Sequence, residues 1–232
     1  MTRHSPARPG TQVASLVMVA VDQTIPARAY TPASTRADWA NRLTRCVVGL
    51  SFFGIGISLI LQARLGAAPW DVLHQGLARK TGISIGNIII IVGFVLLLAW
   101  IPLRQRPGVG TLLNALEIGL LVNLVLPLLP DTDHMVGRVG YLVVGLVVIA
   151  AGSGLYIGSG LGAGPRDGIM MGLKARGISV RVGRTVIELL VLLAGVLLGG
   201  KVGIGTIAFT FAIGPLVHVF LPMFNLPPRR PL

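Results

Sequence analysis

The fold is decided by a short segment, Leu65-Gly66-Ala67-Ala68-Pro69-Trp70-Asp71, which recurs 96 residues later as Leu161-Gly162-Ala163-Gly164-Pro165-Arg166-Asp167. The same offset pairs Gly49 with Gly145 and Gly56 with Gly152. After a one-residue deletion the offset becomes 95, and it then pairs residues 108–111 with residues 203–206. In an apolar sequence, chance agreement would match leucines and valines, whereas these matches include Gly, Pro, Asp and Thr. The pattern predicts two copies of one structural unit, at about residues 42–128 and 138–223.

Composition places the chain in a membrane. Of the 232 residues, 53% are hydrophobic and 12% are charged, and the mean hydropathy is +0.80. Soluble domains carry about 25% charged residues, so a disordered chain is excluded and a soluble enzyme is disfavoured. The single cysteine, Cys46, allows no intramolecular disulfide, and no Cys/His cluster has metal-site spacing. We therefore expect no metal, no cofactor and no catalytic residues.

Six stretches between charged residues are long enough to form membrane spans of roughly 20 residues. These stretches are residues 46–63, 81–103, 107–130, 139–165, 185–200 and 202–228. The fifth is short unless its helix begins before Arg184. The predicted fold is all-α and polytopic, with repeat 1 at residues 41–130 and repeat 2 at residues 131–224. Residues 1–40 are predicted to be a disordered cytoplasmic tail, a cleaved signal peptide being the alternative, and residues 225–232 a cytoplasmic C-terminal tail.

The basic residues indicate orientation. With six spans and a cytoplasmic N-terminus, 15 of the 20 Lys and Arg residues fall on the inner side and five on the outer side. This positive-inside bias predicts a protein of the bacterial inner membrane with both ends in the cytoplasm. The formal charge of +12 has no aromatic interleaving or recognition motif beside it, so nucleic-acid binding is not expected.

Each copy holds three predicted spans, and an odd number of crossings turns the second copy upside down. Inverted-topology repeats are common in secondary transporters, whose sites lie where broken segments of the two halves meet. The alternative is that duplication built a stable helix bundle without transport activity.

A short helix is predicted between the first two spans of each copy, at residues 69–81 and 165–176. Proline suits its first position, Gly82 and Gly177 suit its end, and Ser84 and Ser179 suit the N-cap of the following span. Such helices are too short to cross, so they are broken elements that are either re-entrant or interfacial. Their first-turn carboxylates, on Asp71 and Asp167, have two interpretations that are compatible: they stabilise the helix dipole, or they line a polar cavity.

Several polar residues lie within predicted spans, where an unpaired charge costs at least about 2.5 kcal/mol. Arg184 and Glu188 can pair at helical spacing. Glu117 has no partner in its own helix and is either a proton carrier or a carboxyl that joins helices. The predicted substrate-binding residues are Trp70, Asp71, Asn114, Glu117, Arg166, Asp167, Arg184 and Glu188.

The two copies of the segment, together with Arg184-Thr185-Val186-Ile187-Glu188, resemble the YczE-like membrane proteins, a group often discussed with the YitT and YyaS proteins. The resemblance covers about residues 42–223. It implies a bacterial inner-membrane protein, generally described as a predicted permease, and it implies no substrate.

The sequence therefore favours a small-molecule secondary transporter, with protons as the candidate coupling ion and an unknown substrate. The alternative is a non-transporting accessory protein, or a substrate-capturing subunit of a larger membrane complex. An intramembrane enzyme is disfavoured because no catalytic constellation is present. The expected partners are the lipid bilayer and a small molecule, and the pattern is compatible with a homo-oligomer or a membrane partner protein.

Overall fold

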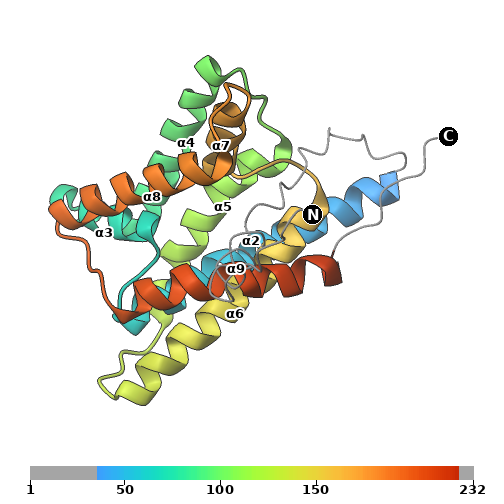
Figure 1. The fold of residues 1–232 in the computed structure, drawn as a ribbon. Coiled ribbons are helices and arrows are strands. Elements are labelled where there is room, and N and C mark those ends of the chain that lie inside the picture. Colours follow the sequence, from blue (N-terminus) through green and yellow to red (C-terminus); the bar gives the residue numbers. More distant parts are fainter. Residues whose placement is uncertain (1–35, 225–232) are drawn as a thin grey trace, which may run out of the picture.

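The computed structural model describes residues 36–224, which fold into α-helices joined by short loops (Figure 1). One 3-10 turn, Leu126–Leu128, follows α5. The helices are α2 (Arg36–Ala63), α3 (Pro69–Thr81), α4 (Ile85–Leu103), α5 (Val109–Val125), α6 (Met135–Ser159), α7 (Pro165–Lys174), α8 (Val180–Leu197) and α9 (Ile204–Phe224). The predicted all-α class is confirmed.

Five helices within residues 36–224 are long and apolar enough to cross a membrane: α2, α4, α5 with its 3-10 extension, α6 and α9. The chain is a multi-pass membrane protein. The expected span at residues 185–200 lies in α8, which begins before Arg184, as a membrane-length helix requires there. However, α8 is not among the five, because its 18 residues include Arg181, Arg184 and Glu188.

The start of α2 differs from the sequence prediction. Residues 36–40 were expected to belong to the N-terminal tail, but α2 begins at Arg36. Asp38 lies in its first turn, and the Arg42 Nε lies 3.3 Å from the Asp38 Oδ2, an i,i+4 pair that supports the extra turn. The remaining tail predictions, at residues 1–35 and 225–232, lie outside the described residues.

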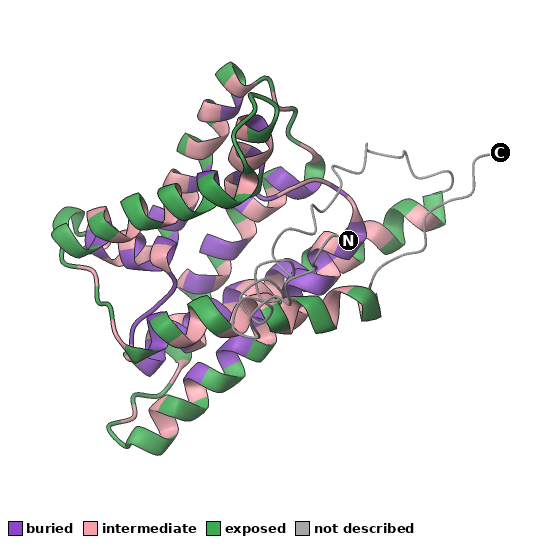
Figure 2. Ribbon diagram, in the orientation of Figure 1, coloured by how far each residue is buried: buried purple, intermediate pink, exposed green. Residues whose placement is uncertain are grey.

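The centre of the molecule is the crossing of α2 and α6, where both helices are largely buried (Figure 2). A Cβ atom on Gly49 would lie 2.7 Å from the Gly152 carbonyl oxygen, and one on Gly152 would lie 2.6 Å from the Gly49 carbonyl oxygen. For Gly56 and Gly145, the corresponding distances to the carbonyl oxygen of the other residue are both 2.9 Å. Membrane helices gain stability from such close backbone packing at small residues.

These crossing contacts follow the sequence offset. Gly49 and Gly56 correspond to Gly145 and Gly152, so exchanging the two copies converts the contact of Gly49 with Gly152 into that of Gly145 with Gly56. Positions matched by the sequence therefore occupy matched places at the crossing.

The loops obey the same exchange. The Gly205 N–H donates to the Leu65 carbonyl at 2.7 Å, and the Gly110 N–H donates to the Leu161 carbonyl at 3.0 Å. Because residues 65 and 205 correspond to residues 161 and 110, one hydrogen bond is the counterpart of the other. The loop that breaks each copy is thus tied to the start of the last helix of the other copy.

The short helices also pack on the opposite copy. α3 lies against α8, where a Cβ on Gly195 would sit 2.6 Å from the Leu73 nitrogen. α7 lies against α4, where the Trp100 Nε1–H donates to the Pro165 carbonyl at 2.8 Å. Each short helix therefore packs on a helix from the other half of the described chain.

The predicted ends of the short helices are largely confirmed. α3 begins at Pro69 and ends before Gly82, which has a φ of 74°. α7 begins at Pro165 but ends at Lys174, two residues earlier than expected, because the chain turns before Gly177, which has a φ of 83°. Ser84 and Ser179 occupy the predicted N-cap positions without donating or accepting a side-chain capping hydrogen bond.

One packing contact occurs in the first copy alone. α4 packs closely along α5, and a Cβ on Gly93 would lie 3.3 Å from the Ala115 Cβ. The corresponding helices of the second copy, α8 and α9, do not pack together in this way. Figure 1 shows them as separate rods joined by the loop after α8.

Candidate functional site

The N-termini of the two short helices meet at the side chains of Trp70 and Arg166. The Arg166 Cζ lies 5.0 Å from the centre of the Trp70 ring, a cation–π contact. These residues are counterparts under the 96-residue offset. A contact between two residues matched by the offset lies where the two matched segments meet. The contact of Trp70 with Arg166 therefore marks the place where the starts of α3 and α7 meet.

The N–H groups of the Arg166 guanidinium are able to donate hydrogen bonds to a ligand. Within residues 36–224 its guanidinium makes the contact with Trp70 but donates no hydrogen bond. It interacts electrostatically with Asp71, Asp167 and Glu188. An arginine presents five N–H donors in a planar fork that suits a carboxylate or phosphate group. The side chain is therefore positioned by stacking and still able to receive an anionic group.

The two first-turn aspartates have different surroundings. Asp71 is buried, and its Oδ1 lies 3.2 Å from the Nδ1 of His74, one turn further along α3. Burial lowers the pKa of His74, and the hydrogen bond with Asp71 opposes this effect. A neutral imidazole that donates from Nδ1 satisfies the Asp71 carboxylate, which can only accept. The partnership is visible in the i,i+3 spacing, although the sequence analysis did not identify it.

Asp167 is exposed, and its carboxylate accepts a hydrogen bond from the Gly164 N–H at the start of α7. Asn114 of α5 borders the same point, since a Cβ on Gly164 would lie 3.1 Å from the Asp167 Oδ2 and 3.6 Å from the Asn114 Nδ2. The Asp167 carboxylate therefore stabilises the start of α7 and can still accept hydrogen bonds from a ligand, so the two interpretations of this residue remain compatible.

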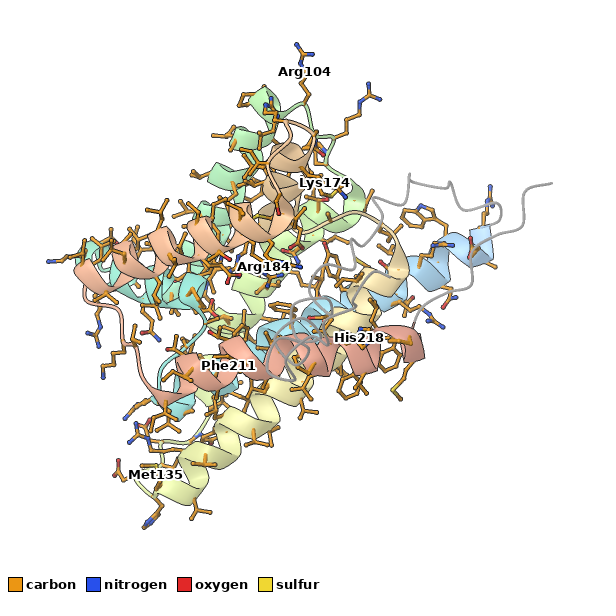
Figure 3. All side chains as sticks on the ribbon, viewed as in Figure 1. Arg104, Met135, Lys174, Arg184, Phe211 and His218 are labelled. Atoms are coloured by element: carbon orange, nitrogen blue, oxygen red, sulfur yellow. The ribbon has the colours of Figure 1, made fainter. Side chains whose placement is uncertain are left out.

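α8 contributes the predicted ion pair. The Arg184 Nε donates to the Glu188 Oε1 at 2.9 Å, which confirms the pairing expected from their spacing. Both side chains interact electrostatically with Asp167. Figure 3 shows Arg184 on the side of α8 that faces α2 and α9.

Seven of the eight predicted site residues thus gather around the start of α7, and Glu117 has its described contact elsewhere. The Glu117 Oε1 accepts a hydrogen bond from the Ser51 hydroxyl of α2 at 2.9 Å. This bond joins two helices, one of the two roles expected for the residue. No group of three His, Cys, Asp or Glu side chains in residues 36–224 has a metal-binding arrangement.

Tyr156 also belongs to this region but was not predicted. Its hydroxyl donates to the Gly162 carbonyl at 2.9 Å, holding the loop before α7, and its side chain interacts electrostatically with Asp167. A tyrosine near the end of α6, six residues before Gly162, gives no sequence signal, because nothing local predicts that the chain folds back upon it.

Comparison with known proteins places the chain among bacterial membrane proteins that have no established activity. It is 35% identical over 185 residues to "Uncharacterized membrane protein YczE" of Bacillus subtilis, covering 78% of this chain and 86% of that relative. An uncharacterised protein of Haemophilus influenzae is 39% identical over 183 residues, covering 78% of this chain and 84% of that relative. "Uncharacterized protein YyaS" of Bacillus subtilis is 30% identical over 183 residues, covering 76% and 90%.

No solved structure matches the chain. The resemblance to YczE and YyaS that the sequence motifs indicated is confirmed, and it extends across both short helices. A model of a protein family of unknown function, DUF6198, matches residues 40–222. This match covers every described element that carries a site residue, and the chain therefore belongs to the DUF6198 family.

Proposed function

We propose that this protein is a small secondary transporter of the bacterial inner membrane, built from two inverted copies with both termini in the cytoplasm. In this proposal α8 is the sixth crossing, the counterpart of α4. The 96-residue offset and the exchanged contacts at the α2–α6 crossing support two related copies. The odd number of crossings in each copy then requires inversion, and the distribution of Lys and Arg gives the orientation.

The observation that carries the proposal is the difference between the two final helix pairs. α4 packs along α5, whereas α8 and α9 stay apart. Two equivalent units in two different arrangements are what alternating access needs, since exchanging the arrangements moves the opening to the other side. With the orientation above, the Asn123 to Asn87 hydrogen bond of 2.7 Å closes the outer ends of α4 and α5. The lack of packing between α8 and α9 is, in this proposal, the cytoplasmic opening.

Glu117 is the proposed proton carrier for coupling. Its described partner, the Ser51 hydroxyl, is neutral and can accept as well as donate a hydrogen bond, so it can accompany either protonation state of the carboxyl. Carboxyl groups within membrane spans commonly serve as proton relays. Glu117→Gln is expected to abolish uptake driven by a pH gradient while leaving ligand binding intact.

Transport can be tested without a known substrate. Proteoliposomes containing the purified protein are incubated with a bacterial metabolite extract under a pH gradient, and their contents are measured by mass spectrometry. Wild-type vesicles are expected to accumulate at least one solute that Asp167→Asn vesicles do not. Asp133→Asn, the same substitution in an exposed loop, is the matched control and should retain uptake.

Uptake of the solute at the wild-type rate by vesicles containing Asp167→Asn would contradict the proposed site. No uptake by the wild type would favour the accessory or capturing role.

The inversion of the second copy is tested separately. Single cysteines replacing Lys80 and Arg176, both exposed near the ends of the short helices, are labelled in intact cells after Cys46→Ser. Labelling of residue 80 from outside and residue 176 from inside is expected; labelling of both from one side would refute the inversion.

A further inference from the structure

We infer that the site at the start of α7 binds an amphoteric small molecule, one that carries both a carboxylate and an ammonium group, as an α-amino acid does. This inference rests on the proposed function, because it names the substrate class of the same site. It is argued from the groups that remain unpaired once the partnerships around the site have been assigned.

Two ionisable pairs in this region satisfy themselves. Arg184 and Glu188 form an ion pair with an N···O distance of 2.9 Å. Asp71 and His74 share a hydrogen bond of 3.2 Å and are both buried. Both pairs contribute to the electrostatic potential around the site, but neither needs a ligand as a partner.

Arg166 and Asp167 remain as adjacent groups of opposite charge with capacity for a ligand. Among the described residues, Arg166 donates no hydrogen bond and is held by stacking on Trp70. Asp167 accepts one hydrogen bond from the Gly164 backbone, which leaves further lone pairs on an exposed carboxylate. Arg166 suits a carboxylate, which the planar guanidinium binds with two parallel hydrogen bonds. Asp167 suits an ammonium group.

A ligand of one charge sign would fit this setting poorly. A purely anionic solute placed on Arg166 would face the carboxylates of Asp71 and Asp167, both of which interact electrostatically with that arginine. A purely cationic solute placed on Asp167 would face Arg166 and Arg184, which interact electrostatically with that aspartate. Like charges at close range disfavour binding, whereas an amphoteric solute meets an opposite charge at each end.

The test uses matched ligands and the full-length protein in lipid nanodiscs. Its thermal unfolding is measured with each of the twenty proteinogenic L-amino acids at millimolar concentration. Every amino acid that raises the Tm is then compared with its decarboxylated amine and its deaminated acid. At least one amino acid is expected to raise the Tm by about 5 °C near saturation, while the amine and the acid raise it by less than about 1 °C.

Variants locate the binding groups. Arg166→Gln and Asp167→Asn are each expected to weaken amino-acid binding by at least about tenfold, since each loses a charge-assisted contact. Arg166→Lys keeps the charge but not the planar fork and should fall between them and the wild type. Lys174→Gln, at the exposed end of α7, is the matched control and should bind normally.

Three outcomes would overturn the inference: no amino acid raises the Tm, the amine or the acid stabilises as strongly as its amino acid, or Arg166→Gln binds with wild-type affinity. The first two need no variant, so a misfolded mutant cannot obscure them. Uptake in proteoliposomes separates the two proposals. Binding of an amino acid without uptake supports this inference and refutes transport; uptake of a purely anionic or purely cationic solute supports transport and refutes this inference.

Discussion

The helix pair α4–α5 and its counterpart α8–α9 differ at the positions that face the partner helix. Gly86 and Gly93 let α4 approach α5 closely, and a Cβ on Gly86 would collide with the backbone of Gly119. The 95-residue offset places Arg181 and Glu188 at the corresponding positions of α8. Two large charged side chains cannot pack against a helix as two glycines do. The difference teaches that positions matched by the sequence offset can differ in packing: α4 lies closely along α5, whereas α8 does not pack along α9.

The facing helices record the same difference. Ala115 and Ile118 of α5 are buried, whereas the corresponding residues of α9 are the exposed Thr210 and the half-buried Ile213. The face of α9 that corresponds to the buried face of α5 is therefore more exposed to solvent or lipid. The Arg184–Glu188 pair on α8 interacts electrostatically with Asp167. In our proposal, the position of α8 therefore affects the candidate site.

The largest effect is expected when a side chain is introduced at the glycine contact. Gly86→Leu should destabilise the protein by about 3 kcal/mol, because the new side chain must displace the α5 backbone. Arg181→Leu, the counterpart substitution on α8, should destabilise the protein less than Gly86→Leu does, because α8 does not pack along α9. The measurement is thermal unfolding in detergent. Equal losses of stability in both variants would show that α8 packs as tightly as α4.

Cross-linking compares the two pairs directly. In a Cys46→Ser background, cysteines replacing Gly93 and Ala115 should form a disulfide readily, because the Cβ positions are 3.3 Å apart, near the disulfide separation of about 3.8 Å. Cysteines replacing Glu188 and Thr210 should react at least about tenfold more slowly, since α8 and α9 do not pack together. Gel mobility under an oxidant measures both rates. Rapid reaction of the second pair would mean that the described arrangement is not the resting one.

Two arginines cap the helix ends at the central crossing, and they do so unequally. Arg138 donates to the Ala63 carbonyl at 2.8 Å and to the Arg64 carbonyl at 2.6 Å, both on another helix end. Its counterpart Arg42 makes one such bond, to the Ser159 carbonyl at 2.9 Å, and a pair within its own helix with Asp38 at 3.3 Å. An i,i+4 pair of that kind adds only about 0.5 kcal/mol. Arg138→Gln should therefore cost about 2 kcal/mol and Arg42→Gln about 1 kcal/mol. Chemical or thermal unfolding of the two variants tests this order, and a greater loss for Arg42→Gln would contradict it.

Features that depend on residues close together in the sequence were predictable, whereas contacts between distant helices were not. Pro69, Gly82 and the Arg184–Glu188 pair were predictable because capping and i,i+4 pairing depend on nearby residues. The stacking of Arg166 on Trp70 was not predictable, although both are predicted site residues, because it depends on how α3 and α7 are placed by the helices they pack on. The separation of α8 from α9 was missed for the same reason.

Glu117 shows the limit most clearly. Its sequence position indicates a carboxyl within a span that has no partner in its own helix, but Ser51 lies 66 residues away, on a helix whose rotation no local pattern specifies. Its place within a span was therefore predictable from hydropathy, whereas its half-buried setting and its partner depended on the packing of α2 against α5.

The smallest effect is expected at the paired threonines that begin α5 and α9. Thr111 accepts a hydrogen bond from the Gly108 N–H at 3.1 Å and also donates to the Ala163 carbonyl at 2.7 Å, which ties α5 to the loop before α7. Its counterpart Thr206 accepts the equivalent bond from the Gly203 N–H at 3.3 Å, and its hydroxyl makes no described bond to the loop before α3.

Thr111→Val removes a bond between copies that Thr206→Val does not, so it should cost about 1 kcal/mol more of unfolding free energy. Both side chains are buried and both substitutions keep a β-branched shape, so the difference isolates the hydroxyl. Urea or thermal unfolding of the two single variants measures it. A loss that is equal in the two variants would mean that α9 is anchored to its loop as firmly as α5. The asymmetry between the halves would then be confined to α8, and motion of α9 would no longer be part of the proposed exchange.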